Sequence, residues 1–178
     1  YPLHFVTHPD APTGSWQAKV KAGGATFEQA VRIETVKPNR LKIELDFGKK
    51  ELSRADEPQQ GQLSSSWLHG APASGLRAQV EVQLRSTNTT FPKYDNFEFD
   101  DPSRTIETEP RTVFDNELNE SGQARLNATL SEDAMLPGKL TASFKTRVYE
   151  RGGDFSTDQF SIPYHPFNIY AGVELPKN

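Results

Sequence analysis

Apolar and polar residues alternate with a period of two along most of this chain, and that alternation restricts the fold to β-structure. Successive side chains of a strand point to opposite faces, so an alternating segment buries one face and exposes the other. The clearest case is the segment 40–47, where Leu41, Ile43 and Leu45 alternate with charged residues. Helical periodicity is nearly absent. We therefore predict an all-β protein.

Turn residues separate the alternating segments at the spacing typical of a β-sandwich. Gly23-Gly24 joins the segments 16–21 and 27–36, and it predicts a hairpin because glycine accepts the positive φ angles of a tight turn. The polar segment 49–60 predicts a break in the sheet, and the aromatic, acidic segment 91–111 predicts a long excursion. The remaining predicted strands are 1–7, 40–47, 62–69, 76–85, 105–108, 112–118, 123–130, 140–149, 155–164 and 170–175, the last being a short strand or a linker.

Pro38 marks the predicted domain boundary. Proline has no amide hydrogen for a sheet ladder, so a strand does not run through it except at an edge. The 178 residues exceed the ~100 of one immunoglobulin-like sandwich and fall short of two. Hydrophobic residues make up 34% of the chain, which suits a thin two-layer stack of sheets. We predict the C-terminal strands of a preceding, incomplete domain at 1–37, an immunoglobulin-like antiparallel β-sandwich at 38–173 and a linker at 174–178.

The composition argues against several kinds of function. The chain has no cysteine, which rules out disulfides, thiol catalysis and cysteine-ligated zinc within it. Its net charge is −4 and it has no basic block of five or more residues, which argues against binding to nucleic acid. The longest apolar run is only a few residues, so we expect no membrane insertion by this segment.

The four histidines do not predict a metal site. His4 and His8 lie on one face of a predicted strand end, about 13 Å apart. That separation is too large for both to bind one metal ion without a bend. His69 and His165 are distant from them and from each other in the sequence. We therefore expect solvated or turn histidines, with no metal and no cofactor.

One acidic cluster could in principle gather oxygen atoms around calcium. It consists of Asp95, Glu98, Asp100 and Asp101. These residues lack both the alternating ligand spacing and the central glycine of a calcium loop. We expect a solvated acidic loop.

Catalytic residues are not predicted either. The carboxylate pairs Asp115/Glu117 and Asp154/Asp158 lack the apolar surroundings that would separate their pKa values, as acid–base catalysis requires. The run Ser64-Ser65-Ser66 has no Gly-x-Ser-x-Gly elbow around it. We expect a chain that is not an enzyme.

The two tryptophans could anchor a partner or fill the core. Trp16 alternates with small and branched apolar residues, so we predict that it faces the core. Trp67 shares its strand face with Ser65 and His69, and the sequence leaves its burial open.

Several segments resemble one domain junction of the bacterial alpha-2-macroglobulins. Pro12-Thr13-Gly14-Ser15-Trp16, the Gly-Gly hairpin and the segment 31–42 resemble the boundary between two macroglobulin domains of that family. There, a Gly-x-Trp strand closes one domain and a Pro-x-Arg segment opens the next. Trp67-Leu68-His69-Gly70-Ala71-Pro72-Ala73 resembles the family's aromatic-Leu-x-Gly-Ala-Pro-Ala turn. Further similar segments are 97–102, 115–122 and 152–158.

This resemblance implies a structural, non-catalytic domain fragment of an endopeptidase inhibitor. Family members are long envelope proteins that trap proteases: a bait region is cut, the molecule rearranges, and an internal thioester can bind the attacker. The thioester needs a Cys-x-x-Gln pattern, and this chain has no cysteine, so that chemistry lies outside it. The resemblance also implies a periplasmic or cell-envelope parent anchored as a lipoprotein. The implied partners are neighbouring domains of the same parent chain, and target proteases met through the full-length protein.

A second hypothesis is a cell-surface adhesin or carbohydrate-binding β-sandwich module. It would use Tyr94, Phe97 and Phe99 as a binding platform. The exposure of these side chains separates the hypotheses. Rings that lie flat on a solvent-facing surface favour an adhesin, whereas rings that pack inward argue against one.

Overall fold

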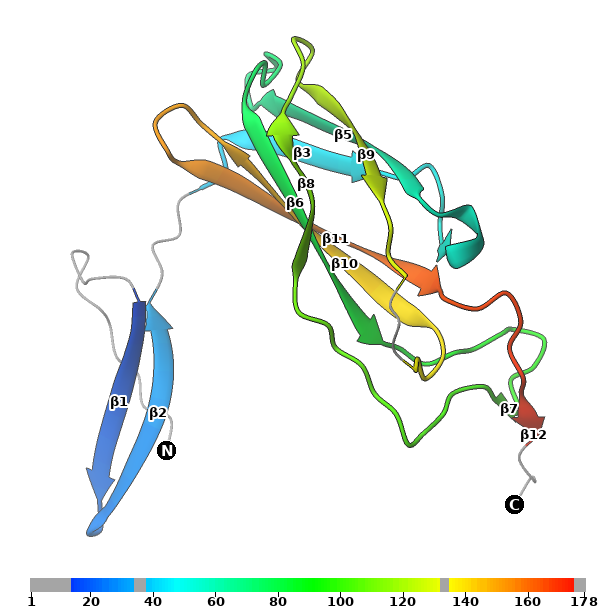
Figure 1. Ribbon diagram of the computed structural model, residues 1–178. Helices are drawn as coiled ribbons and strands as arrows, with labels where there is room; N and C mark the ends of the chain where they lie inside the picture. Colours follow the sequence, from blue (N-terminus) through cyan, green and yellow to red (C-terminus); the bar gives the residue numbers. More distant parts are fainter. Residues whose placement is uncertain (1–13, 34–37, 132–134, 175–178) are drawn as a thin grey trace. The chain divides into compact units, whose positions relative to one another are not determined.

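The computed structural model describes residues 14–33, 38–131 and 135–174. The chain divides into two compact units, Tyr1–Pro38 and Asn39–Asn178 (Figure 1). The predicted strand at 1–7, together with His4 and His8, lies outside the described residues.

The described part of the first unit is a β-hairpin of β1 (Gly14–Ala22) and β2 (Ala25–Ile33). Gly23 and Gly24 form its turn with φ angles of 58° and 83°, a region that favours glycine. This confirms the hairpin predicted at the Gly-Gly dipeptide. The prediction that Trp16 is buried was wrong, because this side chain is 47% exposed. Its strand belongs to a two-stranded sheet, and no second layer covers it within the described part of this unit.

The second unit is an antiparallel β-sandwich of two main sheets, which confirms the predicted fold class. One sheet has the strand order β4-β11-β10-β6-β8 and the other β3-β5-β9, with β4–β11 as the one parallel pairing within these two sheets (Figure 1). The bounds are β3 (Leu41–Asp46), β4 (Leu52–Ser53), η1 (Arg54–Asp56), β5 (Gln59–Trp67), β6 (Arg77–Ser86), β7 (Phe97–Glu98), β8 (Arg111–Glu117), β9 (Gln123–Ala128), β10 (Leu140–Tyr149), β11 (Phe155–His165) and β12 (Val173–Glu174).

The core lies between the two sheets and is built from the alternating residues that the sequence indicated. β3, β6 and β10 each bury every second side chain. Phe47, just after β3, and Phe144 on β10 meet across the layers with ring centroids 4.9 Å apart. The fully buried residues include Leu41, Leu63, Val80, Val82, Leu84, Leu126, Leu140 and Phe144. Each large apolar side chain buried in this way contributes about 1.5–3 kcal/mol.

A part-buried polar contact also ties the two sheets together. The hydroxyl of Tyr164, on β11, donates a hydrogen bond of 2.7 Å to the Oε1 atom of Glu57. The amide of Leu130 donates to the same oxygen at 3.0 Å. Tyr164 is fully buried, and burial together with the Glu57 carboxylate raises the pKa of its phenol. Because Glu57 precedes β5 of the other sheet, the contact fixes one end of the sandwich.

Two segments differ from the sequence prediction. The polar segment 49–60 does not simply break the sheet, because it contains β4, η1 and the start of β5. Leu52 is its one fully buried apolar side chain, and a single apolar residue gives no period that could predict a strand. The strand predicted at 105–108 is reduced to an isolated bridge between Glu107 and Arg85.

The predicted excursion after β6 is held to the sandwich by a polar anchor. The Asp100 carboxylate accepts hydrogen bonds from the backbone amide of Thr89, at 2.8 Å, and from the Thr89 hydroxyl. That hydroxyl oxygen accepts a further bond of 2.7 Å from the amide of Lys139, just before β10. The short strands β7 and β12 then pair antiparallel (Figure 1). The excursion is therefore an ordered part of the domain.

Candidate functional site

The outer face of the five-stranded sheet carries the most developed polar arrangement of the second unit. On β6 and β10, buried apolar residues alternate with outward residues that are polar and mostly half-buried. Strand register places these outward side chains in rows across β8, β6, β10 and β11. The rows on β6 and β10 consist of Arg77, Gln79, Glu81, Gln83 and Arg85 opposite Tyr149, Arg147, Lys145, Ser143 and Thr141.

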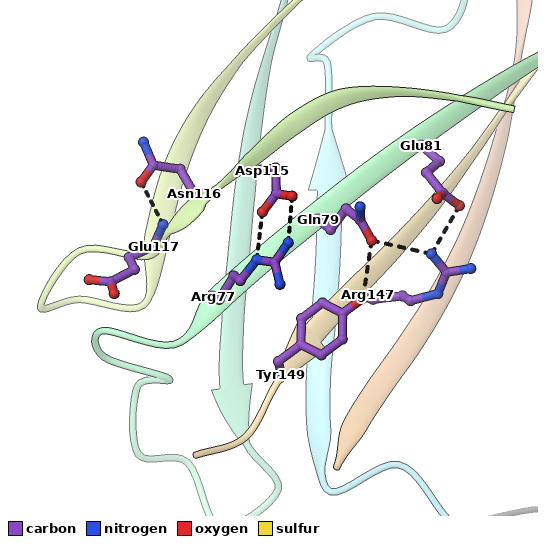
Figure 2. Close-up of polar contacts among 8 residues, drawn as sticks. All are labelled: Arg77, Gln79, Glu81, Asp115, Asn116, Glu117, Arg147 and Tyr149. Atoms are coloured by element: carbon purple, nitrogen blue, oxygen red, sulfur yellow. Dashed lines mark hydrogen bonds and ion pairs between the residues drawn. The ribbon is translucent and has the colours of Figure 1, made fainter. Parts of the chain in front are cut away.

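Arg77 is the best-paired charge of this face. Its guanidinium donates two hydrogen bonds to Asp115, at 2.7 and 2.6 Å, from β6 to the neighbouring β8 (Figure 2). It also lies over the ring of Tyr149, 5.2 Å from the centroid, at a cation–π distance. The hydrogen bonds from Arg77 lower the pKa of the Asp115 carboxyl, and the same contacts raise the pKa of Arg77. This geometry fixes β8 to β6 at one corner of the sheet.

A second group of contacts continues across the same face. The hydroxyl of Tyr149 donates to the Oε1 atom of Gln79 at 3.0 Å, and Arg147 donates to that oxygen at 3.4 Å. Arg147 also forms an ion pair of 3.0 Å with Glu81, and both side chains are about three-quarters buried. Figure 2 shows these four residues linked between β6 and β10. These polar groups are satisfied by one another. We therefore interpret the network as a preorganised surface and not as a set of catalytic groups.

Beside this network the face is hollowed. Ser143 and Ser161 lie opposite each other on β10 and β11, with their hydroxyl oxygens 3.0 Å apart. Short side chains in this row leave a hollow of about 470 Å³. Its rim includes Gln83, Lys145 and Gln159. Lys145 is half-buried, and its ammonium makes no ion pair or hydrogen bond with the described residues.

The predicted histidine positions do not come together. The Nδ1 atom of His165 lies 3.2 Å from the hydroxyl of Tyr170, and its Nε2 atom lies 3.4 Å from Glu51. His69 stacks on Trp67, with ring centroids 6.2 Å apart. Among the residues that the structure describes, no group of three His, Asp or Glu side chains could hold a metal ion.

The acidic cluster is split between different structural tasks. Asp100 anchors the excursion to Thr89. Asp101 accepts hydrogen bonds from the amide and hydroxyl of Ser103, and these contacts lower the pKa of its carboxyl. The other two members, Asp95 and Glu98, are exposed.

The candidate catalytic groups also have structural settings. Asp115 is engaged by Arg77 while Glu117 is exposed, and Asp154 and Asp158 lie in the turn before β11 and on β11 itself. Ser65 is 5% exposed. It is the register partner of Ile43, whose side chain lies in the core, so its hydroxyl is not presented to a substrate.

Trp67 packs partly against the core. The guanidinium of Arg40 lies 5.4 Å from the centroid of its ring. The sequence left the burial of Trp67 open. In the structure its side chain is half-buried, with a cation over one face of its ring.

The aromatic platform that an adhesin would need is not formed by these rings. Phe97 and Phe99 are half-buried, and only Tyr94, at 52%, is strongly exposed. Phe99 meets Phe91 edge-on at 4.8 Å, and Phe91 contacts Tyr170 at 5.5 Å. The rings thus pack on one another as a small cluster beneath the excursion.

Comparison with known proteins matches this chain to one family. The family model described as the bacterial alpha-2-macroglobulin MG5 domain matches residues 39–166. No curated protein sequence matches the chain. No helix in the described part of the chain has the length and apolar character to cross a membrane.

Solved structures of bacterial alpha-2-macroglobulins share the fold. The native conformation of the Escherichia coli protein matches with a TM-score of 0.61 at 21% identity, over 92% of this chain and 10% of that one. The Salmonella protein reacted with methylamine matches at 0.58 and 22% identity, over 93% and 11%. The trypsin-activated E. coli protein matches at 0.57 and 22% identity, over 91% and 11%. The chain thus spans about a tenth of the length of these proteins.

Proposed function

This chain belongs to the bacterial alpha-2-macroglobulin family, with an MG5 domain over residues 39–166, and we propose that it is a structural, non-catalytic segment of a protease-trapping parent. In that parent the sandwich holds neighbouring domains while the molecule rearranges after proteolysis. The match of the family model to nearly the whole sandwich carries this proposal. A continuous core and the tie between Tyr164 and Glu57 supply the stiffness that such a role needs.

One relative in particular supports a link to proteases. The trypsin-activated protein of E. coli is a family member that a protease activates. The trapping activity is proposed for the whole parent, because this chain corresponds to about a tenth of such a protein. Within the parent, its direct partners would be the adjoining domains, and target proteases would be met by the full-length molecule. We place the parent in the periplasm or cell envelope as a lipoprotein, on the family relationship alone.

We assign residues 1–37 to a preceding macroglobulin-like domain, 38–173 to the sandwich domain and 174–178 to a linker. The hairpin supports the first assignment, because a two-stranded sheet is only marginally stable alone in water. Cross-strand pairs place Val20 beside Phe27 and Trp16 beside Val31 on one face. Trp16, Val20 and Phe27 are 47%, 39% and 61% exposed. An apolar face of this kind is completed by a second sheet.

The trapping proposal is tested by comparing the chain with its parent. We expect the full-length parent to protect a large protein substrate from trypsin while leaving a small peptide substrate accessible. The 178-residue chain alone should protect neither substrate from trypsin and should hydrolyse nothing itself. Inhibition of trypsin by the isolated chain, or a parent that leaves the protease unaffected, would contradict the proposal.

The hairpin assignment has its own test in tryptophan fluorescence. A Trp67→Phe variant leaves Trp16 as the one tryptophan of the chain. We expect acrylamide to quench Trp16 readily in the 178-residue chain, and much less in a protein extended through the preceding domain. The assignment fails if quenching is equal in the two proteins.

A further inference from the structure

We propose that the hollow beside Lys145 is a docking site for a carboxylate-bearing segment of another domain in the same parent chain. The inference rests on the proposed function, because it assumes that this domain works among others. It adds a specific contact surface and the chemistry of its partner. Three observations on the outer face of the five-stranded sheet carry it.

The first observation is that Lys145 has no counter-ion among the described residues. Its register partner on β6 is Glu81, which would be the natural counter-ion. The Glu81 carboxylate is instead engaged by Arg147 at 3.0 Å. Lys145 is half-buried without an anionic partner in the described part of the chain. Partly buried lysines are ordinarily paired or extend their ammonium into water, so this cation is available for a carboxylate.

The second observation is that the other charges around the hollow are already balanced. Arg147 pairs with Glu81, and Arg85 pairs with Glu107 at 2.9 Å. Lys145 therefore gives the hollow a positive excess, although the chain as a whole carries a net charge of −4. Such a local excess attracts an acidic group and repels a basic one.

The third observation is the shape and chemistry of the floor. The short side chains of Ser143 and Ser161 lie beside the longer Gln83, Lys145 and Gln159 and leave a hollow of about 470 Å³. This space is of the size that admits a protruding side chain and its backbone. The Ser143–Ser161 hydroxyl pair and the amide of Gln159 can donate hydrogen bonds to a carboxylate entering from outside, whereas the Gln83 amide already donates to Glu107 and Thr108. Glutamate or aspartate on a loop of an adjoining domain fits these groups.

Zero-length cross-linking of the full-length parent with a carbodiimide tests the proposal directly. This reagent joins only a lysine and a carboxylate that are in contact. We expect Lys145 to be joined to an Asp or Glu outside residues 39–178, identified by mass spectrometry. In the 178-residue chain, the same lysine should give only internal links. Links to Glu81 alone in both proteins would overturn the proposal.

Acylation rates give a second readout that does not depend on the cross-link. We expect a water-soluble acylating reagent to modify Lys145 at least about tenfold more slowly in the parent than in the isolated chain. Lys42 is the control, because its side chain is 72% exposed on the other sheet. Its rate should change much less. Equal rates for Lys145 in the two proteins would overturn the docking site.

Charge variants of the parent complete the test. Lys145→Arg should preserve docking and Lys145→Glu should lose it, as measured by limited proteolysis at the domain borders. A Lys145 cross-link that mass spectrometry traces to a carboxylate of added trypsin would assign the site to the protease and contradict the proposal. If the parent fails to trap proteases but the interdomain link forms, the docking site stands. If trapping occurs and Lys145 stays free, only the docking site falls.

Discussion

The hydroxyl of Tyr164 and the Oε1 atom of Glu57 lie 2.7 Å apart, joining β11 of one sheet to the segment that leads into β5 of the other. Both ends of this contact are positioned by strands of opposite layers. It is therefore a polar crosslink at one end of a largely apolar sandwich.

Tyr164→Phe is expected to destabilise the second unit by about 1–3 kcal/mol, because a part-buried hydrogen bond to a carboxylate is lost and, among the described residues, Glu57 keeps only the Leu130 amide. Urea unfolding measures the difference. The control is Tyr149→Phe, which removes a hydrogen bond to the neutral amide of Gln79 on the outer face and should cost below about 1 kcal/mol. Equal costs for the two variants would argue against the crosslink.

Two leucines on β5 and just after it offer a matched test of the core. Leu63 is 0% exposed and Leu68 is 71% exposed. Leu63→Ala should cost about 2–5 kcal/mol through the cavity that it leaves. Leu68→Ala should stay within about 0.5 kcal/mol. Chemical denaturation of both variants measures the free energy of unfolding. A large loss of stability in Leu68→Ala would show that the core is not where the structure places it.

Alkaline pH should loosen the aromatic cluster of Phe91, Phe99 and Tyr170. Burial, with the negative charges of Asp100 and Glu51, raises the pKa of Tyr170 to about 12 in the folded chain. The fold thus favours the neutral phenol, and this stabilisation is complete below about pH 10, the ordinary tyrosine pKa. It is lost as the pH rises from about 10 to 12.

Tyrosinate absorbance and the NMR signals of Phe91 would follow this titration. In Tyr170→Phe the step near pH 12 should lose one tyrosine, and Phe91 should respond less. Ionisation of Tyr170 at its ordinary pKa would show that its ring is not packed as described.

Asp100→Asn should loosen the excursion after β6. The substitution replaces a charged acceptor of two hydrogen bonds from Thr89 with a weaker neutral one, at a cost of about 1–2 kcal/mol. Hydrogen exchange at the amides of Thr89 and Lys139 should become faster. Asp101→Asn is the control, since among the described residues its side chain bonds to Ser103 and Arg104 within the same loop. Unchanged exchange protection of these amides in Asp100→Asn would show that Asp100 does not anchor the excursion.

The alternating pattern predicted most of the sandwich because its strands bury one face each. Ile43 and Phe144 could be placed in the core from their neighbours alone. Trp16 obeyed the same pattern and is nevertheless exposed, because a pattern states that a face is apolar and not that a partner layer is present. Leu52 failed in the opposite way, as a single buried residue within polar sequence.

The outer-face network could not be predicted from the sequence. Alternation shows that Arg77 and Asp115 point outward, but their pairing depends on which strands are neighbours in the sheet. The same holds for Lys145, because its register partner Glu81 is paired with Arg147 instead. Such relationships arise from topology and register, which the local sequence does not specify.

The pairing of β12 with β7 affects how this domain would carry mechanical load. A pull on the chain beyond residue 174 would reach these two-residue strands before it reaches β11, which is bonded along its length to β10. An antiparallel pair so short can separate one residue at a time. The β12–β7 pair would then separate first, and the chain that follows β11 would become longer, while the two packed sheets keep their shape.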